Sequence, residues 1–207
     1  MENCENQRKT GTTTVGLLCS DGVVLAADRK VTLGNLVDNA EFQKVYEIKP
    51  HIGMTTAGSV ADAQRIIKIM KAEASLYEIQ RGREMSVEAA ATLLGNILQN
   101  NKFWPYFVGL TVGGIDTKPR LYSVDAMGSV VPQKIAFEGS GSPIALGVLE
   151  AGYKENQTVK ENIPLAAKAV KAAQERDIYS GGKTLDVVAI TRRGMKFLTE
   201  DEVKNLL

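Results

Sequence analysis

The chain has 207 residues, of which 44% are hydrophobic and 24% are charged, and its formal net charge at pH 7 is +1. These values are typical of one soluble globular domain, and because no basic or acidic block stands out, we expect neither nucleic acid nor a membrane as a partner. The single histidine, His51, excludes a His-rich metal site, and we expect no metal and no cofactor. Two cysteines and a polar N-terminal stretch without an apolar segment predict a reducing, cytoplasmic location.

The first half of the chain is predicted to form strands followed by two helices. Residues 1–11 are hydrophilic and aperiodic, as in a leader that precedes the fold. Alternating and β-branched residues predict strands at Thr12–Cys19, Val23–Ala27, Gln43–Ile48 and Ile52–Ala57. Ser59 and Ser86 each precede a helical stripe of apolar residues, so two capped helices are expected, the first ending near Gly82.

The second half repeats the order of strands followed by helices. Strands are expected at Phe107–Ile115, Arg120–Asp125, Val130–Phe137, Leu185–Arg192 and Met195–Leu198. Helices are expected at Ile144–Lys154, at Ile163–Ile178 and after Thr199, where a capping box opens the last one. Helices in two separate pairs suggest two faces to cover, so we expect an α/β (α+β) fold in which helices cover two mainly antiparallel, packed sheets. No linker interrupts residues 12–207, which we take as one domain.

The most informative feature is Thr12, which directly follows Gly11 at the first position of the predicted fold. If the Gly11–Thr12 bond is cut, Thr12 gains a free α-amine beside its own hydroxyl. The unperturbed pKa of such an amine is about 7.7–8.0, so it can act as a general base at neutral pH without a histidine. The sequence therefore suggests a self-activating hydrolase with an N-terminal threonine nucleophile.

Such a site needs further groups. A nearby lysine would favour the threonine alkoxide by its charge, and a carboxylate would orient that lysine. A hydroxyl and a carboxylate should position the amine, and backbone N–H groups must meet the developing oxyanion. Another segment, Ser180–Thr184, looks like the end of a phosphate-binding loop, but Asp177 stands where that loop needs its first glycine, which argues against a nucleotide site.

From Thr12 to about Leu198 the chain resembles the β subunits of the 20S proteasome, archaeal type, which are N-terminal nucleophile hydrolases. The segments that carry the resemblance, in order, are GTTTVG (11–16), AADRKVT (26–32), QKVYEI (43–48), TTAGSVADAQ (55–64), GGIDTKPRLYSVDAMG (113–128), EGSGSP (138–143), QERD with YSGG (174–182) and LDVVAITRRG (185–194). The family fold is the four-layer αββα sandwich, which agrees with the predicted element order.

The resemblance assigns a role to each matching residue. It implies that Thr12 is the nucleophile, released by autocatalytic removal of the propeptide 1–11 at the Gly11–Thr12 bond. The implied catalytic set is Thr12, Asp28, Lys44, Ser140, Asp177 and Ser180, with the backbone N–H of Gly58 serving the oxyanion. Asp28 would support Lys44, whereas the other three would hold the N-terminal amine and its water. The implied substrate-binding residues are Thr32, which pairs with substrate main chain, and Val31, Phe42, Tyr46, Thr56 and Val60.

The implied activity is that of a threonine endopeptidase that degrades unfolded proteins inside a closed chamber. Because the pocket positions are largely apolar, we expect cleavage after hydrophobic residues. The family assembles two seven-membered β rings between two α rings, so the implied partners are proteasome α subunits, other β subunits and a regulatory ATPase ring. Ile178 and Tyr179 are bulkier than the family pattern, and Lys183 adds a charge near the expected site.

Two other functions remain open on the sequence. A bacterial two-ring ATP-dependent threonine peptidase shares the threonine and the lysine, although it is shorter. A structural ring subunit without activity is the other alternative, although such subunits usually lack one of Thr12, Lys44 and Asp28, all of which are present.

Overall fold

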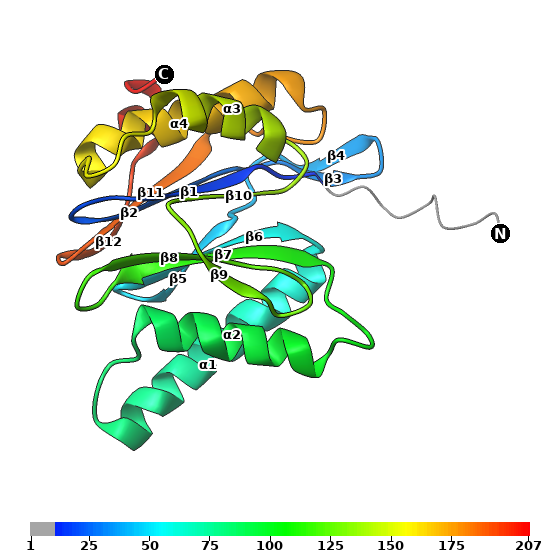
Figure 1. Cartoon of the computed structure of the whole chain (residues 1–207). Coiled ribbons are helices and arrows are strands. Elements are labelled where there is room, and N and C mark those ends of the chain that lie inside the picture. The colour runs from blue at the N-terminus through cyan, green and yellow to red at the C-terminus, as the bar shows by residue number, and fades with distance from the viewer. Residues whose placement is uncertain (1–10) are drawn as a thin grey trace.

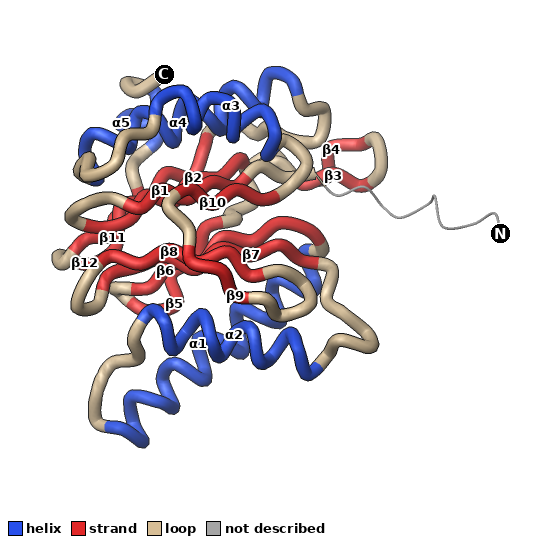
Figure 2. The backbone as a smooth tube through the Cα atoms, in the orientation of Figure 1, coloured by secondary structure: helices blue, strands red, loops and turns tan. Residues whose placement is uncertain are grey.

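A computed structural model describes residues 11–207, so of the predicted propeptide only Gly11 lies within the described part. Two five-stranded sheets lie face to face, and helices cover the outer face of each sheet (Figures 1 and 2). All strand pairs in both sheets are antiparallel. The predicted four-layer αββα sandwich is therefore confirmed.

The first sheet has the strand order β10-β1-β2-β11-β12. Its strands are β1 (Thr14–Leu18), β2 (Gly22–Asp28), β10 (Ile135–Glu138), β11 (Leu185–Thr191) and β12 (Gly194–Phe197). The helices that cover it are α3 (Ser142–Gly152), α4 (Val159–Arg176) and the short α5 (Glu200–Lys204). Valines, leucines and alanines that alternate along β1 and β2 pack against α3 and α4, which fixes these helices on the outer face.

The second sheet has the order β5-β6-β7-β8-β9 and is covered by two helices. Its strands are β5 (Val45–Lys49), β6 (Ile52–Gly58), β7 (Val108–Ile115), β8 (Pro119–Val124) and β9 (Val130–Pro132). The helices are α1 (Val60–Arg81) and α2 (Val87–Asn100). Ser59 and Ser86 cap them as predicted, since each side chain accepts the backbone N–H three residues on.

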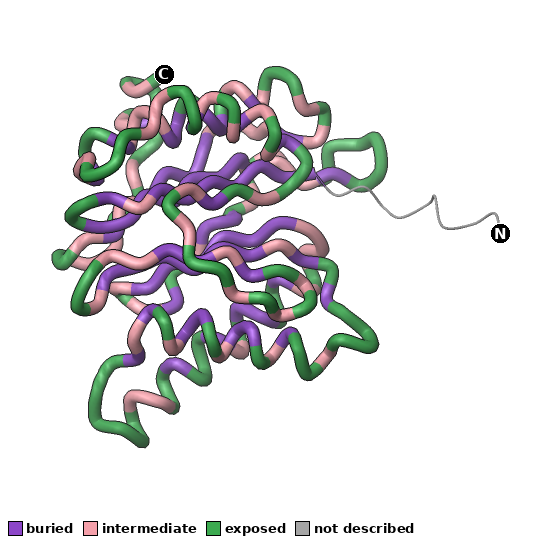
Figure 3. The backbone as a smooth tube through the Cα atoms, in the orientation of Figure 1, coloured by how far each residue is buried: buried purple, intermediate pink, exposed green. Residues whose placement is uncertain are grey.

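A small hairpin of β3 (Val31–Leu33) and β4 (Leu36–Asn39) stands apart from both sheets and was not predicted. It projects beside the end of the first sheet at which the described chain begins, and most of its residues are exposed (Figures 1 and 3). Because both faces of β4 are exposed, its sequence lacks the alternation of a half-buried strand. A bulge between Val31 and Thr32 further breaks the period.

Two predicted boundaries were wrong. The strand expected at Val130–Phe137 is two strands, β9 and β10, which pair in different sheets, so the chain crosses between the sheets after Pro132. Proline donates no backbone N–H, which suits it to the end of a strand. Helix α4 starts at Val159, before the predicted Ile163, because Thr158 and Glu161 form a capping box, and Pro164 is accommodated inside the helix.

The inner layer between the sheets is apolar over most of its length. Val23, Leu25 and Ile190 of the first sheet pack against Leu121 and Ile115 of the second. These side chains are fully or almost fully buried, and Figure 3 shows the corresponding strands as the most buried part of the backbone. The two sheets are thereby held in fixed positions, so residues at the ends of strands from different sheets can form one site.

At the end of the sheets that carries Thr12, this inner layer becomes polar. The hydroxyls of Thr14, Thr55 and Thr111 are buried without a hydrogen-bond partner among the described residues. Glu138 lies opposite Thr14 in the β1–β10 ladder. Its carboxylate covers Gly109 of the other sheet so closely that a Cβ there would lie 2.5 Å from Oε2. A carboxyl group thus lies in a partly buried position between the sheets.

Burial raises the pKa of Glu138 from 4.5 to about 7, and the negative charge of Asp125 adds to the rise. The folded chain therefore binds more protons than the unfolded chain between these two values. The cost of ionising Glu138 is fully present above pH 7 and absent below pH 4.5.

We therefore expect Glu138→Gln to stabilise the fold by about 1 kcal/mol at pH 8, a figure reduced because the carboxylate is partly exposed. At pH 4.5 we expect the substitution to change the free energy of unfolding little. Denaturant unfolding at both pH values measures this, with Glu73→Gln on the exposed face of α1 as the control. A gain of equal size at the two pH values would contradict the burial of this carboxylate as its cause.

Candidate active site

Thr12 lies just before β1 and is almost completely buried, with 4% of its surface exposed. Its hydroxyl donates a hydrogen bond to the carbonyl oxygen of Gly11 at 2.6 Å. Its backbone N–H donates to the Ser140 hydroxyl at 3.3 Å, across the turn that leads from β10 into α3. The hydroxyl of Thr12 therefore lies beside the peptide bond that it is predicted to cut.

Asp28, at the end of β2, is fully buried and accepts four donors. One carboxylate oxygen accepts the Lys44 ammonium at 2.7 Å and the N–H of Thr13 at 2.8 Å. The other accepts the N–H groups of Gly181 at 2.9 Å and Lys30 at 3.1 Å. Both oxygens of this buried carboxylate are thus paired with donors, and the carboxylate holds the lysine in one place.

Lys44 precedes β5 and reaches the site from the second sheet. Burial lowers the pKa of its ammonium, whereas the charges of Asp28 and Asp186 act in the opposite direction. Its Nζ lies 3.5 Å from the carbonyl oxygen of Gly11. The ammonium can therefore stabilise negative charge that develops on that oxygen or on the neighbouring Thr12 hydroxyl.

Ser140, Asp177 and Ser180 form a connected network beside Thr12. One oxygen of Asp177, the residue that ends α4, accepts both serine hydroxyls at 2.6 Å. The Ser180 hydroxyl also lies 2.6 Å from the hydroxyl of Thr13. The three residues that were predicted to hold the N-terminal amine are thus brought together, and Ser140 contacts the nitrogen that would become that amine.

The bulky pair Ile178 and Tyr179 does not block this network. The ammonium of Lys30 donates a hydrogen bond to the carbonyl oxygen of Ile178 at 2.8 Å and holds that loop. A Cβ at Gly11 would overlap the Cβ of Tyr179, so only glycine fits at position 11. Lys183 lies at the surface and pairs with Glu41 at 2.8 Å.

Gly58 ends β6, and the Ser59-capped N-terminus of α1 follows it directly. Its φ of +108° is a conformation that favours glycine, and a Cβ would overlap the carbonyl oxygen of Phe107. Gly58 and Thr12 line the same small cavity of about 20 Å³. This placement next to the start of a helix of 22 residues suits a group that meets negative charge.

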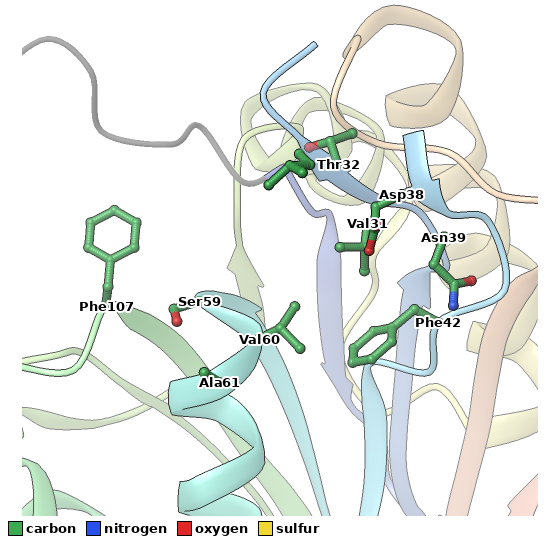
Figure 4. Close-up of a pocket in the computed structure, with 10 residues that line it drawn as sticks. Val31, Thr32, Asp38, Asn39, Phe42, Ser59, Val60, Ala61 and Phe107 are labelled. Atoms are coloured by element: carbon green, nitrogen blue, oxygen red, sulfur yellow. The ribbon is translucent and has the colours of Figure 1, made fainter. Parts of the chain in front are cut away.

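A larger groove of about 720 Å³ adjoins this cavity, and Figure 4 shows its lining. Four of the predicted substrate residues line both spaces: Val31, Thr32, Phe42 and Val60. Thr56 lines only the inner cavity. Tyr46 lines neither, because its ring packs against the core beneath α1 and its hydroxyl donates to the Gln43 carbonyl.

The groove also has a wall that the sequence analysis missed. It is formed by Leu33, Asp38 and Asn39 of the hairpin, and by Ser59, Ala61 and Phe107 opposite them (Figure 4). The exposed Leu36 and Val37 extend the apolar surface of that hairpin. Leu33, Asp38 and Asn39 could have been found only by predicting β3 and β4.

Within residues 11–207, the structure contains no helix that combines the length and the apolar character needed to span a bilayer.

Comparison with known proteins agrees with this geometry. A sequence model of the family described as proteasome subunit matches residues 8–190. Proteasome subunit beta of Methanocaldococcus fervens is 46% identical over 200 residues, which are 95% of this chain and 89% of that protein. Proteasome subunit beta 1 of Thermococcus onnurineus is 46% identical over 202 residues (97% and 98%), and its counterpart in Thermococcus gammatolerans is 48% identical over 188 residues (91% and 93%). The chain therefore belongs to the proteasome subunit family, and its relatives are archaeal β subunits.

Proposed function

We propose that this chain is a catalytic β subunit of a 20S proteasome core particle, a threonine endopeptidase that degrades unfolded proteins. The observation that carries the proposal is the arrangement around Thr12: its hydroxyl touches the Gly11 carbonyl, and the buried Lys44 ammonium lies 3.5 Å from the same oxygen. A hydroxyl, a carbonyl carbon and a stabilising cation thus lie together in a water-excluded place, which is the requirement for acyl transfer.

The same hydroxyl first activates the chain. Thr12 Oγ attacks the carbonyl carbon of Gly11, the C–N bond breaks, and the hydroxyl proton ends on the departing nitrogen of Thr12. The resulting ester between Gly11 and Thr12 is then hydrolysed by water. The products are residues 1–11 with a new carboxylate and a chain that begins with the free amine of Thr12.

Hydrolysis of substrate repeats this chemistry between molecules. Thr12 Oγ attacks the substrate carbonyl, its proton passes to the Thr12 amine, and the amine returns a proton to the leaving nitrogen. The N–H of Gly58 stabilises the oxyanion, and Lys44 stabilises the alkoxide by charge. Ser140, Asp177 and Ser180 hold the amine, and water resolves the acyl ester.

In this role the chain assembles with α subunits and with other β subunits in seven-membered rings, so that Thr12 faces an enclosed chamber. A regulatory ATPase ring would supply unfolded protein, and the particle would be cytoplasmic. The archaeal relatives, named as proteasome β subunits, support the assembly, whereas the ATPase partner rests on the family resemblance alone.

The structural-subunit alternative is disfavoured by the state of the site. Burying an ion pair such as Asp28–Lys44 costs several kcal/mol per ion before its partners offset that cost, so the pair is weakly explained by a contribution to stability. The pair is complete, together with its donors and the adjoining hydroxyl network, which favours a catalytic role over a structural one. The bacterial two-ring peptidase is disfavoured because the relatives that cover nearly the whole chain are archaeal β subunits.

The first test is peptide hydrolysis by the particle assembled with α subunits. Replacing Lys44 with alanine is expected to lower kcat by about a thousandfold or more, because the cation that stabilises the alkoxide is lost. Lys49→Ala is the matched control, since Lys49 ends β5, the strand that Lys44 precedes, and pairs with Glu78 away from the site. Activity of the Lys44 variant close to that of the control would contradict the catalytic role.

The second test concerns the residue after which substrates are cut. We expect peptides with leucine, phenylalanine or tyrosine at that position to have kcat/KM values at least about tenfold above those with lysine or glutamate, because apolar Val31, Phe42 and Val60 line the groove of about 720 Å³ that adjoins the Thr12 cavity. Val60→Glu should move the preference towards lysine. Val131→Glu, on exposed β9, should leave the preference unchanged; an unchanged preference in both variants would rule out this groove as the specificity pocket.

A further inference from the structure

Asp186, on β11, is a buried carboxylate to which the proposed mechanism gives no task. Only 8% of its surface is exposed. Burial raises its pKa above the usual value for an aspartate, while its hydrogen bond from the Lys44 backbone and the charge of Arg29 counteract the rise. Burying a carboxylate is costly unless the group is paired and hydrogen-bonded. The contacts of Asp186 therefore indicate what it does.

The contacts of Asp186 lead directly to the catalytic lysine. Its Oδ2 accepts the backbone N–H of Lys44 at 3.1 Å, and its Oδ1 lies 3.5 Å from Nε of Arg29. Lys44 leads into the second sheet, whereas Asp186 belongs to the first. The hydrogen bond therefore fixes the main chain of Lys44 to the opposite sheet.

The strand of Asp186 also holds the partner of that lysine. In the β2–β11 ladder, Leu185 pairs with Asp28 and Asp186 pairs with Ala27. Strand β11 thus fixes Asp28 through the ladder and Lys44 through the Asp186 carboxylate. Both partners of the 2.7 Å ion pair are thus held by the same strand. A site that tolerates only small displacements of its groups needs such support.

Asp186 also contributes charge. The charged groups that act on Lys44 are Asp28, Asp186 and Lys30, of which the two carboxylates favour its protonated form and Lys30 opposes it. Arg29 and Lys44 are the cations near Asp186. Without Asp186, burial would lower the pKa of Lys44 further, and Asp28 alone would oppose it.

We propose that Asp186 is a positioning residue for the hydrolysis, which holds the main chain of Lys44 and supplies a second negative charge near its ammonium. The inference rests on the proposed function, since it assigns a supporting role in the same reaction. Asp186 does not line the cavity that contains Thr12, and within the proposed catalytic set its hydrogen bond is to Lys44.

Two variants separate position from charge. Asp186→Asn keeps an oxygen that accepts the Lys44 N–H but removes the charge, and Asp186→Ala removes both. Asp116→Asn is the matched control, because Asp116 also accepts backbone N–H groups, from Val87 at 3.0 Å and Thr117 at 2.6 Å, away from the Thr12 site. The readouts are kcat and KM of the assembled, processed particle from pH 5 to 10.

For the asparagine variant we expect the alkaline limb of kcat to move to lower pH, because Lys44 loses its proton earlier, while the acid limb stays in place. For the alanine variant we expect kcat to fall about tenfold or more, with KM within about threefold of the wild-type value. The control should keep the wild-type pH profile even if it is less stable.

An alkaline limb of the asparagine variant that coincides with the wild-type limb would overturn the inference, and this readout remains if the alanine variant fails to assemble. Full activity of an assembled alanine variant would overturn it too. Failure of the proposed function gives a different result: the wild-type particle itself would be inactive, or Thr12→Ala would retain wild-type activity.

Discussion

The buried ion pair between Asp28 and Lys44 is the interaction on which the rest of the site depends. Moving two charges out of water costs several kcal/mol per ion, and the pair is stable only with good geometry and further hydrogen bonds. Asp28 meets that condition with backbone donors from Thr13, Lys30 and Gly181, so two distant chain segments, around Thr13 and Gly181, converge on it. The same donors place Thr13, and therefore Thr12, beside the ammonium.

The sandwich explains how residues far apart in sequence reach this pair. The apolar inner layer holds the two sheets in register, so the end of β2 and the start of β5 meet at one end of the molecule. Helix ends complete the site there: α1 begins after Gly58, α3 begins after Ser140, and Asp177 directly follows the end of α4. The ends of helices and strands therefore place these groups, and the exposed hairpin β3–β4 forms one wall of the groove beside the site.

Much of this could be predicted from the sequence, because its signals are local. Serine caps marked the starts of α1 and α2, and a threonine after a glycine at the start of the fold suggested the nucleophile. The features that were missed or predicted wrongly depend on three-dimensional context. The exposed hairpin has no buried face to create a period, and the crossing from β9 to β10 depends on which sheet each half joins. No local sequence pattern marks Asp186, because its proposed role depends on a hydrogen bond to a residue 142 positions away.

The most direct measurement of the central claim is the intact mass of this chain after assembly with α subunits. If Thr12 is the nucleophile that frees itself, the wild-type mass corresponds to a chain that begins at Thr12, and a Thr12→Ala variant in the same particle retains residues 1–11. Retention of residues 1–11 by the wild-type chain in a fully assembled particle would contradict the account and leave a structural ring subunit in its place.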